Sequence, residues 1–472
     1  MSVPQSQSSR GLAADVIRSR FSAAMSAMYR QEVPAYGTLL EIVHTINQRT
    51  LSATPALKAQ LQDNDNLSRL SEERHGAIRL GSAAELCMMR RIFAVMGMHA
   101  VGYYDLSSAG IPVHSTAFRP TDNAALAKNP FRVFTSLLRL PLIADDALRA
   151  QATAIINQRQ IFTPAAVQLT ALAETQGGLN AAQATTFINE VLETFRWHAD
   201  ANVTSDTYNK LHAEHRLIAD IVCFQGPHIN HLTPRTLDID AVQTAMPAHA
   251  ITAKAVVEGP PPRRCPILLR QTSFHALSEN IRFRDKQQGK HTARFGEVEQ
   301  RGVALTRKGR ALYDELLATT RQKITPAADG SNAAAYQTTL QETFSAFPDD
   351  WQLLLTQQLA YFFFSPTTAA NTTAATAAAN DTVARLIEKG LISYAPITYE
   401  DFLPVSAAGI FQSNLGNHVN EKNLHSASRQ EFETALGQSV IDEFQLYETM
   451  QAESLAHCRR VLAGNSDKLS EK

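Results

Sequence analysis

Two histidines, His228 and His231, follow an apolar run in the segment Gln225–Arg235. The β-branched, apolar residues over 218–224 predict a buried strand that a Gly-Pro turn then interrupts. Imidazoles at the end of such a strand can hold a metal ion, because the strand fixes the direction of their side chains. Hydrogen bonds that merely cap the loop are the alternative explanation for both histidines.

A further imidazole lies on a second strand-like piece, His75-Gly-Ala-Ile-Arg79. The two-residue period of a strand places His75, Ala77 and Arg79 on one face, with the first and last about 13 Å apart at Cα. One group could then hold a metal ion while the other holds a carboxylate of a metal-bound substrate. Alternatively, Arg79 pairs with a surface acid and His75 fills a turn.

The matching anions are Glu297 and Glu299, which share a face of a third predicted strand. Two acids that face the same way repel each other unless a cation compensates them. Arg294 and Arg301 could provide that compensation. Two histidines and one carboxylate are the ligand set of mononuclear non-haem Fe(II) oxygenases. Spacing alone leaves open whether these distant residues meet.

Composition narrows the class of protein. The 472 residues are 44% hydrophobic and 19% charged, which is typical of a globular protein with a sizeable core. A net charge of −1 gives no electrostatic reason to expect nucleic acid or an anionic membrane as a partner. Residues 1–10 lack the apolar core of a signal peptide, and no apolar run has the length of a membrane span. We therefore expect a cytoplasmic protein.

Several common signatures are missing. The sequence contains no G-x-G-x-x-G, Walker A, G-x-S-x-G or H-E-x-x-H motif. Its four cysteines lie far apart, which argues against a zinc ribbon or a disulfide framework. These absences argue against a nucleotide-dependent transferase, a serine hydrolase and a zincin protease.

The elements that must position these residues alternate between strand and helix. Helical periods occupy 12–30 and begin again near Gly37, and a capping box at Ser82–Glu85 opens a helix whose buried face is Leu86, Met89, Phe93 and Met96. Further strands are predicted over 75–80, 101–106, 111–118, 131–138, 252–258, 265–274 and 293–305. Thr306 is expected to cap another helix. Loops are expected over 327–335 and 366–382, the latter a flexible Ala/Thr segment.

These predictions combine into an α+β fold in one catalytic domain over 1–472. The strand core is expected from about 75–140, 218–305 and 386–415. The Ala/Gln/Glu-rich residues 144–216 are expected to form a large helical insertion packed on that core.

At the chemically interesting residues the chain resembles a known family, the 2-oxoadipate dioxygenase/decarboxylases, which are D-2-hydroxyglutarate synthases of lysine catabolism. The matching runs extend over much of the chain, from roughly residue 15 to 450. They are Glu73–Arg79, Val113–Pro120, Pro227–Asp240, Arg294–Leu305 and Tyr399–Leu415.

The resemblance implies a core similar to that of vicinal-oxygen-chelate enzymes, in which curled β-sheets surround a metal, with helical flanks. It implies that His75, His231 and Glu299 ligate Fe(II), with His228 and Glu297 beside them. Arg79 then resembles the clamp for a substrate carboxylate. Val405 and Ser406 match the segment that closes over the far end of the substrate.

The implied reaction converts 2-oxoadipate and O2 to D-2-hydroxyglutarate and CO2, by oxidative decarboxylation and hydroxylation within one molecule. Substrate and co-substrate are then the same 2-oxo diacid, with no separate 2-oxoglutarate. Two alternatives stay open. One is an oxygenase of similar fold acting on another 2-oxo acid, such as an aryl pyruvate. The other is a non-catalytic, metal-stabilised binding protein.

Overall fold

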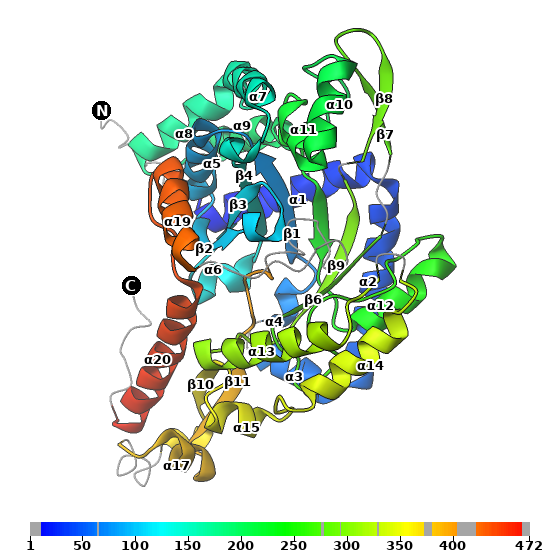
Figure 1. Cartoon of the computed structure of the whole chain (residues 1–472). Helices are drawn as coiled ribbons and strands as arrows, with labels where there is room; N and C mark the ends of the chain where they lie inside the picture. The colour runs from blue at the N-terminus through cyan, green and yellow to red at the C-terminus, as the bar shows by residue number, and fades with distance from the viewer. Residues whose placement is uncertain are drawn as a thin grey trace, which may run out of the picture.

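The computed structural model is a mixed α+β structure whose strands form open sheets (Figure 1). It describes residues 11–63, 66–274, 278–292, 294–327, 330–371, 380–403 and 422–464. None of the helices in this part of the chain combines the length and apolar character needed to cross a lipid bilayer.

The N-terminal helices follow the predicted apolar periods. They are α1 (Ala14–Glu32), α2 (Pro34–Ala53), α3 (Pro55–Asp63) and α4 (Asn66–Arg69). The predicted face of the first helix, which carries Ile17, Phe21, Met25 and Met28, is buried. Pro34 occupies the first turn of α2, where its missing N–H costs no hydrogen bond.

The central sheet has five strands in the order β2-β3-β4-β1-β5. Its elements are β1 (Arg74–Leu80), α5 (Ala83–Val95), β2 (His99–Asp105), β3 (Val113–Arg119), α6 (Asn123–Lys128), β4 (Arg132–Leu138) and β5 (His231–Pro234). Strand β1 pairs in parallel with β4 and antiparallel with β5. The four strands predicted over 75–138 are therefore confirmed, with boundaries that differ by at most two residues.

Half of the predicted capping box at α5 is present. The Ser82 hydroxyl accepts from the backbone N–H of Glu85 at 3.2 Å. The Glu85 carboxylate instead accepts from the N–H of Gly81 at 2.7 Å, and so caps the residue one position earlier. The predicted buried face of α5 is confirmed, because Leu86, Met89, Phe93 and Met96 are all fully buried.

Helices fill the region between β4 and β5. They are α7 (Asp146–Gln158), α8 (Pro164–Gln176), α9 (Ala181–Glu193), α10 (Ser205–Glu214) and α11 (Arg216–Val222). The strand predicted over 218–224 is wrong, because most of this run forms α11. Residues Leu217–Val222 are buried on every side of the helix, so the run shows no polar face that would reveal a helical period.

The remaining strands form two-stranded sheets. They are β6 (Leu269–Phe274) with β9 (Gly296–Arg301), β7 (Glu279–Arg282) with β8 (Gln288–His291), and β10 (Phe362–Pro366) with β11 (Ile392–Pro396). The prediction over 265–274 is confirmed in its C-terminal part, and the prediction over 293–305 in its central part. Residues 252–258 form only isolated bridges, at Ala253 and Glu258, so the strand predicted there is wrong.

The C-terminal part is mostly helical. After α12 (Ile239–Ala245) the helices are α13 (Arg307–Lys323), α14 (Ala333–Phe344), α15 (Trp351–Thr356), α17 (Val383–Glu388), α19 (Lys422–Leu436) and α20 (Glu443–Leu462). The Thr306 cap on α13 is confirmed by its bond from Gly309 N at 3.1 Å. Figure 1 shows α20, in red, running beside β10.

One of the two predicted loops differs from the structure, and the other lies partly outside the described residues. Helix α14 already begins at Ala333, inside the loop expected over 327–335. In the Ala/Thr segment, residues 368–371 form a short 3-10 helix, and 372–379 lie outside the described residues. The single-domain organisation with a helical insertion stays a prediction.

Strand β1 separates two apolar clusters. Ala77 faces one cluster with Phe134, whereas Ile78 and Leu80 face the other, together with the buried sides of α1, α2 and α5. By strand alternation, His75 and Arg79 share the face of Ala77. His75 and Arg79 therefore lie on the face of β1 that meets the Ala77 cluster, opposite the face that carries Ile78 and Leu80.

Glu443, at the start of α20, makes the stability of the fold depend on pH. Burial, followed by the charge of Asp401, raises its pKa to about 7. Because this lies above the value of about 4.3 expected in an unfolded chain, stability should fall as the pH rises between the two. We expect Glu443→Gln to raise the melting temperature at pH 8, with a gain that shrinks toward pH 5. Glu453→Gln, an exposed position on the same helix, is the control and should behave alike at both pH values.

Candidate metal centre

Adjacent strands bring the two histidines to the same face. In the β1–β5 pairing, Ala77 lies opposite His231 and His75 lies opposite Thr233. Paired residues project to the same side of a sheet, so both imidazoles face one space. Gly76, between His75 and Ala77, leaves room for the Ile229 side chain, because a Cβ there would lie 2.5 Å from Cδ1 of Ile229.

Strand β9 adds the carboxylates next to β5. Arg235 forms a bridge with Glu299, and the N–H of Thr236 donates to the Glu299 carbonyl at 2.7 Å. Glu297 and Glu299 are two residues apart and therefore share a face of β9. Both are fully buried.

The side chains of His75, His231 and Glu297 form a compact cluster. One potential ligand atom from each lies within 4.8 Å of the others, and all three residues are buried. His75 Nε2 is 3.1 Å and His231 Nε2 is 3.9 Å from Glu297 Oε1. Two imidazoles and a carboxylate at these separations could hold one divalent transition-metal ion.

Unsatisfied buried atoms support a cation at this cluster. Among the described residues, neither ring nitrogen of His231 has a hydrogen-bond partner, and neither does Glu297 Oε2. Glu297 Oε1 is held by donors, Thr233 Oγ1 at 3.0 Å and Gln271 Nε2 at 2.9 Å. Buried polar atoms without partners are costly, so a ligand that engages them would stabilise this arrangement.

The second carboxylate, Glu299, has a different set of contacts. It accepts two bonds from Arg301, at 2.8 and 2.9 Å, and lies 2.9 Å from His75 Nδ1. Although burial alone would raise its pKa, Arg301 and then His75 lower the pKa of Glu299 to about 2. Glu299 is therefore an ionised side chain already compensated by a guanidinium.

These contacts bear on which carboxylate is the ligand. The sequence led us to expect Glu299 in the ligand set, with Glu297 beside it. In the structure, Nε2 of His75 faces the cluster that contains Glu297, and Nδ1 faces Glu299. A ligating histidine usually gives its second ring nitrogen to a carboxylate, which fixes its orientation. Both carboxylates therefore lie beside His75, and the ligand role of Glu299 stays a prediction. Because Glu297 is the carboxylate that clusters with both histidines, we propose it as the alternative ligand.

The histidines differ in their protonation. Burial, the positive charge of His75 and that of Arg79 hold the pKa of His231 well below its usual range. Burial alone would also lower the pKa of His75, but Glu299 and Glu297 raise it. His231 is thus a neutral imidazole at physiological pH, which is the form that binds metals.

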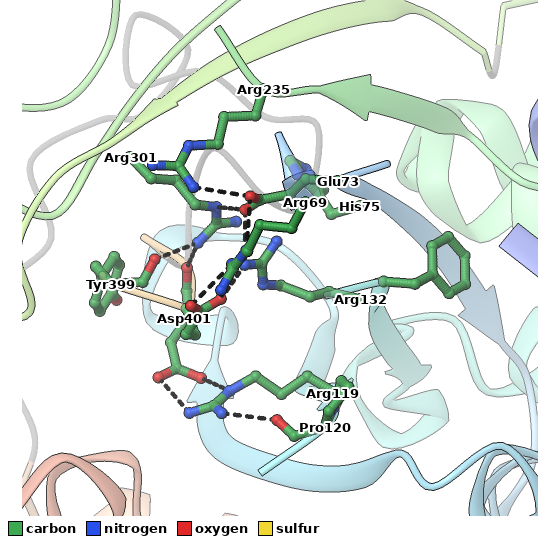
Figure 2. Close-up of polar contacts among 12 residues, drawn as sticks. Arg69, Glu73, His75, Arg119, Pro120, Arg132, Arg235, Arg301, Tyr399 and Asp401 are labelled. Atoms are coloured by element: carbon green, nitrogen blue, oxygen red, sulfur yellow. Dashed lines mark hydrogen bonds and ion pairs between the residues drawn. The ribbon is translucent and has the colours of Figure 1, made fainter. Parts of the chain in front are cut away.

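A network of buried arginines and carboxylates lies beside His75, as Figure 2 shows. Glu73, next to His75, accepts from Arg132 and from Arg235, each at 2.8 Å. Arg69 reaches both oxygens of Glu400, at 3.0 and 3.1 Å. Arg132 contacts Glu400 as well. These residues lie on four separate segments, so their ion pairs hold the strands of the site together.

The same network fixes residues 399–403 against the cluster. Arg301 donates to the carbonyls of Tyr399 and Asp401 at 2.8 and 2.9 Å, and Arg119 forms two bonds to the Asp401 carboxylate at 2.7 and 2.9 Å (Figure 2). Phe402 then packs edge-on against the His75 ring, with 5.0 Å between centroids. An apolar ring therefore covers one side of a candidate ligand.

Arg79, the predicted carboxylate clamp, lies at the other end of the same face of β1. It is buried, and its Nη1 donates to Asp220 Oδ2 at 2.6 Å. His228 is not in the cluster with His75, and its Nε2 instead lies 3.2 Å from Asp220 Oδ1. Val405 and Ser406 lie outside the described residues.

Sequence reasoning missed several residues of this site. Asp220 was hidden in the run misread as a strand, and Gln271, Thr233 and Phe402 belong to no motif that predicts metal binding. The repeated arginines in the segments 69–79 and 294–301 were the available signal for a buried network of charges.

Comparisons with known proteins agree with the predicted resemblance. The 2-oxoadipate dioxygenase/decarboxylase family model matches residues 21–414. Relatives named 2-oxoadipate dioxygenase/decarboxylase from Escherichia coli (strain K12) and Pseudomonas putida are 56% and 55% identical, over 95% of this chain and 98% and 97% of their own. A solved structure described as the hydroxyglutarate synthase in complex with 2-oxoadipate, from Pseudomonas putida, matches with a TM-score of 0.89 at 55% identity, covering 96% of this chain and 99% of that chain.

Isosteric amides can separate the two carboxylates. We expect Glu297→Gln to abolish tight metal binding, because it removes a charged ligand. Glu299→Gln should weaken binding only roughly 10- to 100-fold, because it removes the group that orients a ligand. Anaerobic titration with Fe(II) or Mn(II) measures both, and thermal denaturation of the metal-free proteins checks the fold. The reverse order of effects would return the ligand role to Glu299.

Proposed function

The chain belongs to the 2-oxoadipate dioxygenase/decarboxylase family, and on that premise we propose that it converts 2-oxoadipate and O2 to 2-hydroxyglutarate and CO2. The bond between the keto carbon and its neighbouring carboxylate breaks, and that carboxylate leaves as CO2. One atom of O2 enters the new carboxylate formed at the keto carbon. The other atom enters a C–H bond of the adjacent carbon and becomes the hydroxyl group. Atoms and electrons therefore balance without an external reductant.

The observation that carries this proposal is the buried cluster of His75, His231 and Glu297, with ligand atoms that no described protein group satisfies. Two histidines and one carboxylate are the protein ligands of non-haem Fe(II) oxygenases. An Fe(II) ion held there would supply binding positions for the 2-oxo acid and for O2, together with the electrons that activate O2. The identity of the metal is part of the proposal.

Each protein group then has a defined task. Glu299, held by two bonds from Arg301, keeps His75 in one orientation through its Nδ1. Thr233 and Gln271 hold Oε1 of Glu297. This support lets the ligands keep their positions without bound substrate, which lowers the cost of ordering them during the reaction.

Arg79 is the group that we propose for the distal carboxylate of the substrate. It shares the β1 face with His75, four residues and about 13 Å away at Cα. A planar guanidinium can accept a carboxylate through two parallel bonds, which a neutral group cannot do. A diacid would then lie along the strand with its keto-acid end at the cluster and its other carboxylate at Arg79.

Apolar rings limit the access of water to the cluster. Phe402 packs on His75, and Phe295 packs on His231 with 4.7 Å between ring centroids. Exclusion of water strengthens the charged contacts and protects a reactive centre. We also propose that the core architecture is vicinal-oxygen-chelate-like and that Val405 and Ser406 cover the far end of the substrate.

Substrate preference and stoichiometry test the reaction. We expect 2-oxoadipate to be used with a much higher kcat/KM than phenylpyruvate, because only the diacid can engage Arg79. O2 uptake, CO2 release and 2-hydroxyglutarate formation should be equal in amount, and removal of the metal with a chelator should stop all three. Preference for the aryl acid would contradict the proposal, and binding without O2 uptake would indicate a non-catalytic protein.

The clamp is tested by Arg79→Lys, which keeps the charge and loses the planar fork. We expect kcat/KM for 2-oxoadipate to fall by at least about 10-fold, mainly through KM. Arg282→Lys is the matched control, because Arg282 is an exposed residue whose contact is Asp200. An unchanged kcat/KM for Arg79→Lys would remove Arg79 from substrate binding.

A further inference from the structure

Asp220 connects Arg79 to a second buried polar cluster, separate from the candidate metal ligands. Its Oδ2 accepts from Arg79 Nη1 at 2.6 Å, and its Oδ1 lies 2.9 Å from His291 Nε2. His228 Nε2 is 3.2 Å from the same Oδ1. All four side chains are at least nine-tenths buried, with exposed fractions of 2% to 6%.

The Asp220 carboxylate is the acceptor in each of its hydrogen bonds. Burial would raise its pKa, but His228 and then Arg79 hold the pKa of Asp220 well below its usual range. An ionised carboxylate only accepts, so Nε2 of His291 must donate to it. With that tautomer, Nδ1 of His291 accepts from the Tyr208 hydroxyl, 2.8 Å away. Tyr208 and His291 therefore fix the position of Asp220.

Aromatic packing also holds the two histidines beside Asp220 in place. The Trp197 ring is stacked on His291, with 6.1 Å between centroids and 6° between planes. It also meets His228 edge-on at 4.8 Å. The carboxylate that receives Arg79 thus sits on a support built from α10, α11, the loop before β5 and strand β8, which have no candidate metal ligand among their described residues.

We propose that Asp220 is the positioning residue for Arg79 and therefore a determinant of the preference for 2-oxo diacids over 2-oxo monoacids. The inference rests on the proposed function of Arg79. A long arginine side chain has many rotamers, and a fixed ionic bond at Nη1 restricts it to one direction before substrate arrives. Asp220 also compensates the buried guanidinium when no substrate carboxylate is present.

The proposal predicts that one substitution at Asp220 affects a diacid and a monoacid substrate differently. Asp220→Asn preserves the size of the side chain and removes the charge that holds Arg79. We expect kcat/KM for 2-oxoadipate to fall roughly 10- to 100-fold, mainly through KM, because a buried charged hydrogen bond is lost. For 2-oxohexanoate, which has the same chain length without the distal carboxylate, kcat/KM should change less than about threefold. Anaerobic metal affinity should be unchanged, since Asp220 contacts none of the candidate ligands.

Two further variants keep the test decisive. Tyr208→Phe removes only the hydroxyl that bonds His291, and we expect a smaller loss confined to the diacid, even where Asp220→Asn folds poorly. Asp200→Asn is the matched control, because its exposed carboxylate also forms two bonds to an arginine, Arg282, at 2.7 and 2.9 Å. It should leave both substrates unaffected.

The outcomes distinguish this inference from the proposed function. If Arg79→Lys impairs the diacid selectively while Asp220→Asn and Tyr208→Phe impair both acids equally or neither, the positioning role is wrong and the clamp stands. If Arg79→Lys impairs both acids equally, the clamp itself is wrong. A selective loss of diacid use in all three variants supports the positioning role.

Discussion

Two buried carboxylates on one face of β9 both require a compensating positive charge. Glu297 and Glu299 are two residues apart and fully buried, so each needs its own positive partner. Glu299 has Arg301. Within the described residues, Glu297 has no arginine or lysine at ion-pair distance, and its contacts are two imidazoles and the neutral donors Thr233 and Gln271. This asymmetry supports the proposal that Glu297 is a metal ligand, since a cation would compensate its charge and contact Oε2, which has no hydrogen-bond partner among the described residues.

The arginine network follows from the same constraint. A buried charge is costly unless it is paired and hydrogen-bonded, and the pairs of Glu73, Glu400 and Asp401 meet both conditions. Because their partners come from distant segments, the network also fixes geometry. Arg301 shows this directly: one guanidinium binds Glu299 through two nitrogens and the carbonyls of Tyr399 and Asp401 through the third. The orientation of His75 and the placement of Phe402 are thus set by one side chain.

The sequence predicted the structure correctly where the spacing of apolar and polar residues alone determines an element. Strand alternation correctly placed His75 and Arg79 on one face, and helical periods found the buried faces of α1 and α5. Prediction from the sequence failed where contacts with other parts of the chain determine the structure. Helix α11 is buried on all sides, which erased its period and concealed Asp220. The choice between Glu297 and Glu299 depends on which nitrogen of His75 each one meets, and that is a property of the packed strands.

Strand pairing explains why the two ends of the site keep a constant separation. His75 and Arg79 are both on β1, which is paired with β4 over 75–80 and with β5 over 74–77. A shift of one residue in either pairing would turn both side chains to the opposite face, where Ile78 and Leu80 now fill a core. The spacing between the cluster and Arg79 is therefore enforced by the hydrophobic core. On the proposed function, selection of a substrate by the distance between its acidic groups would rest on this rigid strand and its two well-supported side chains.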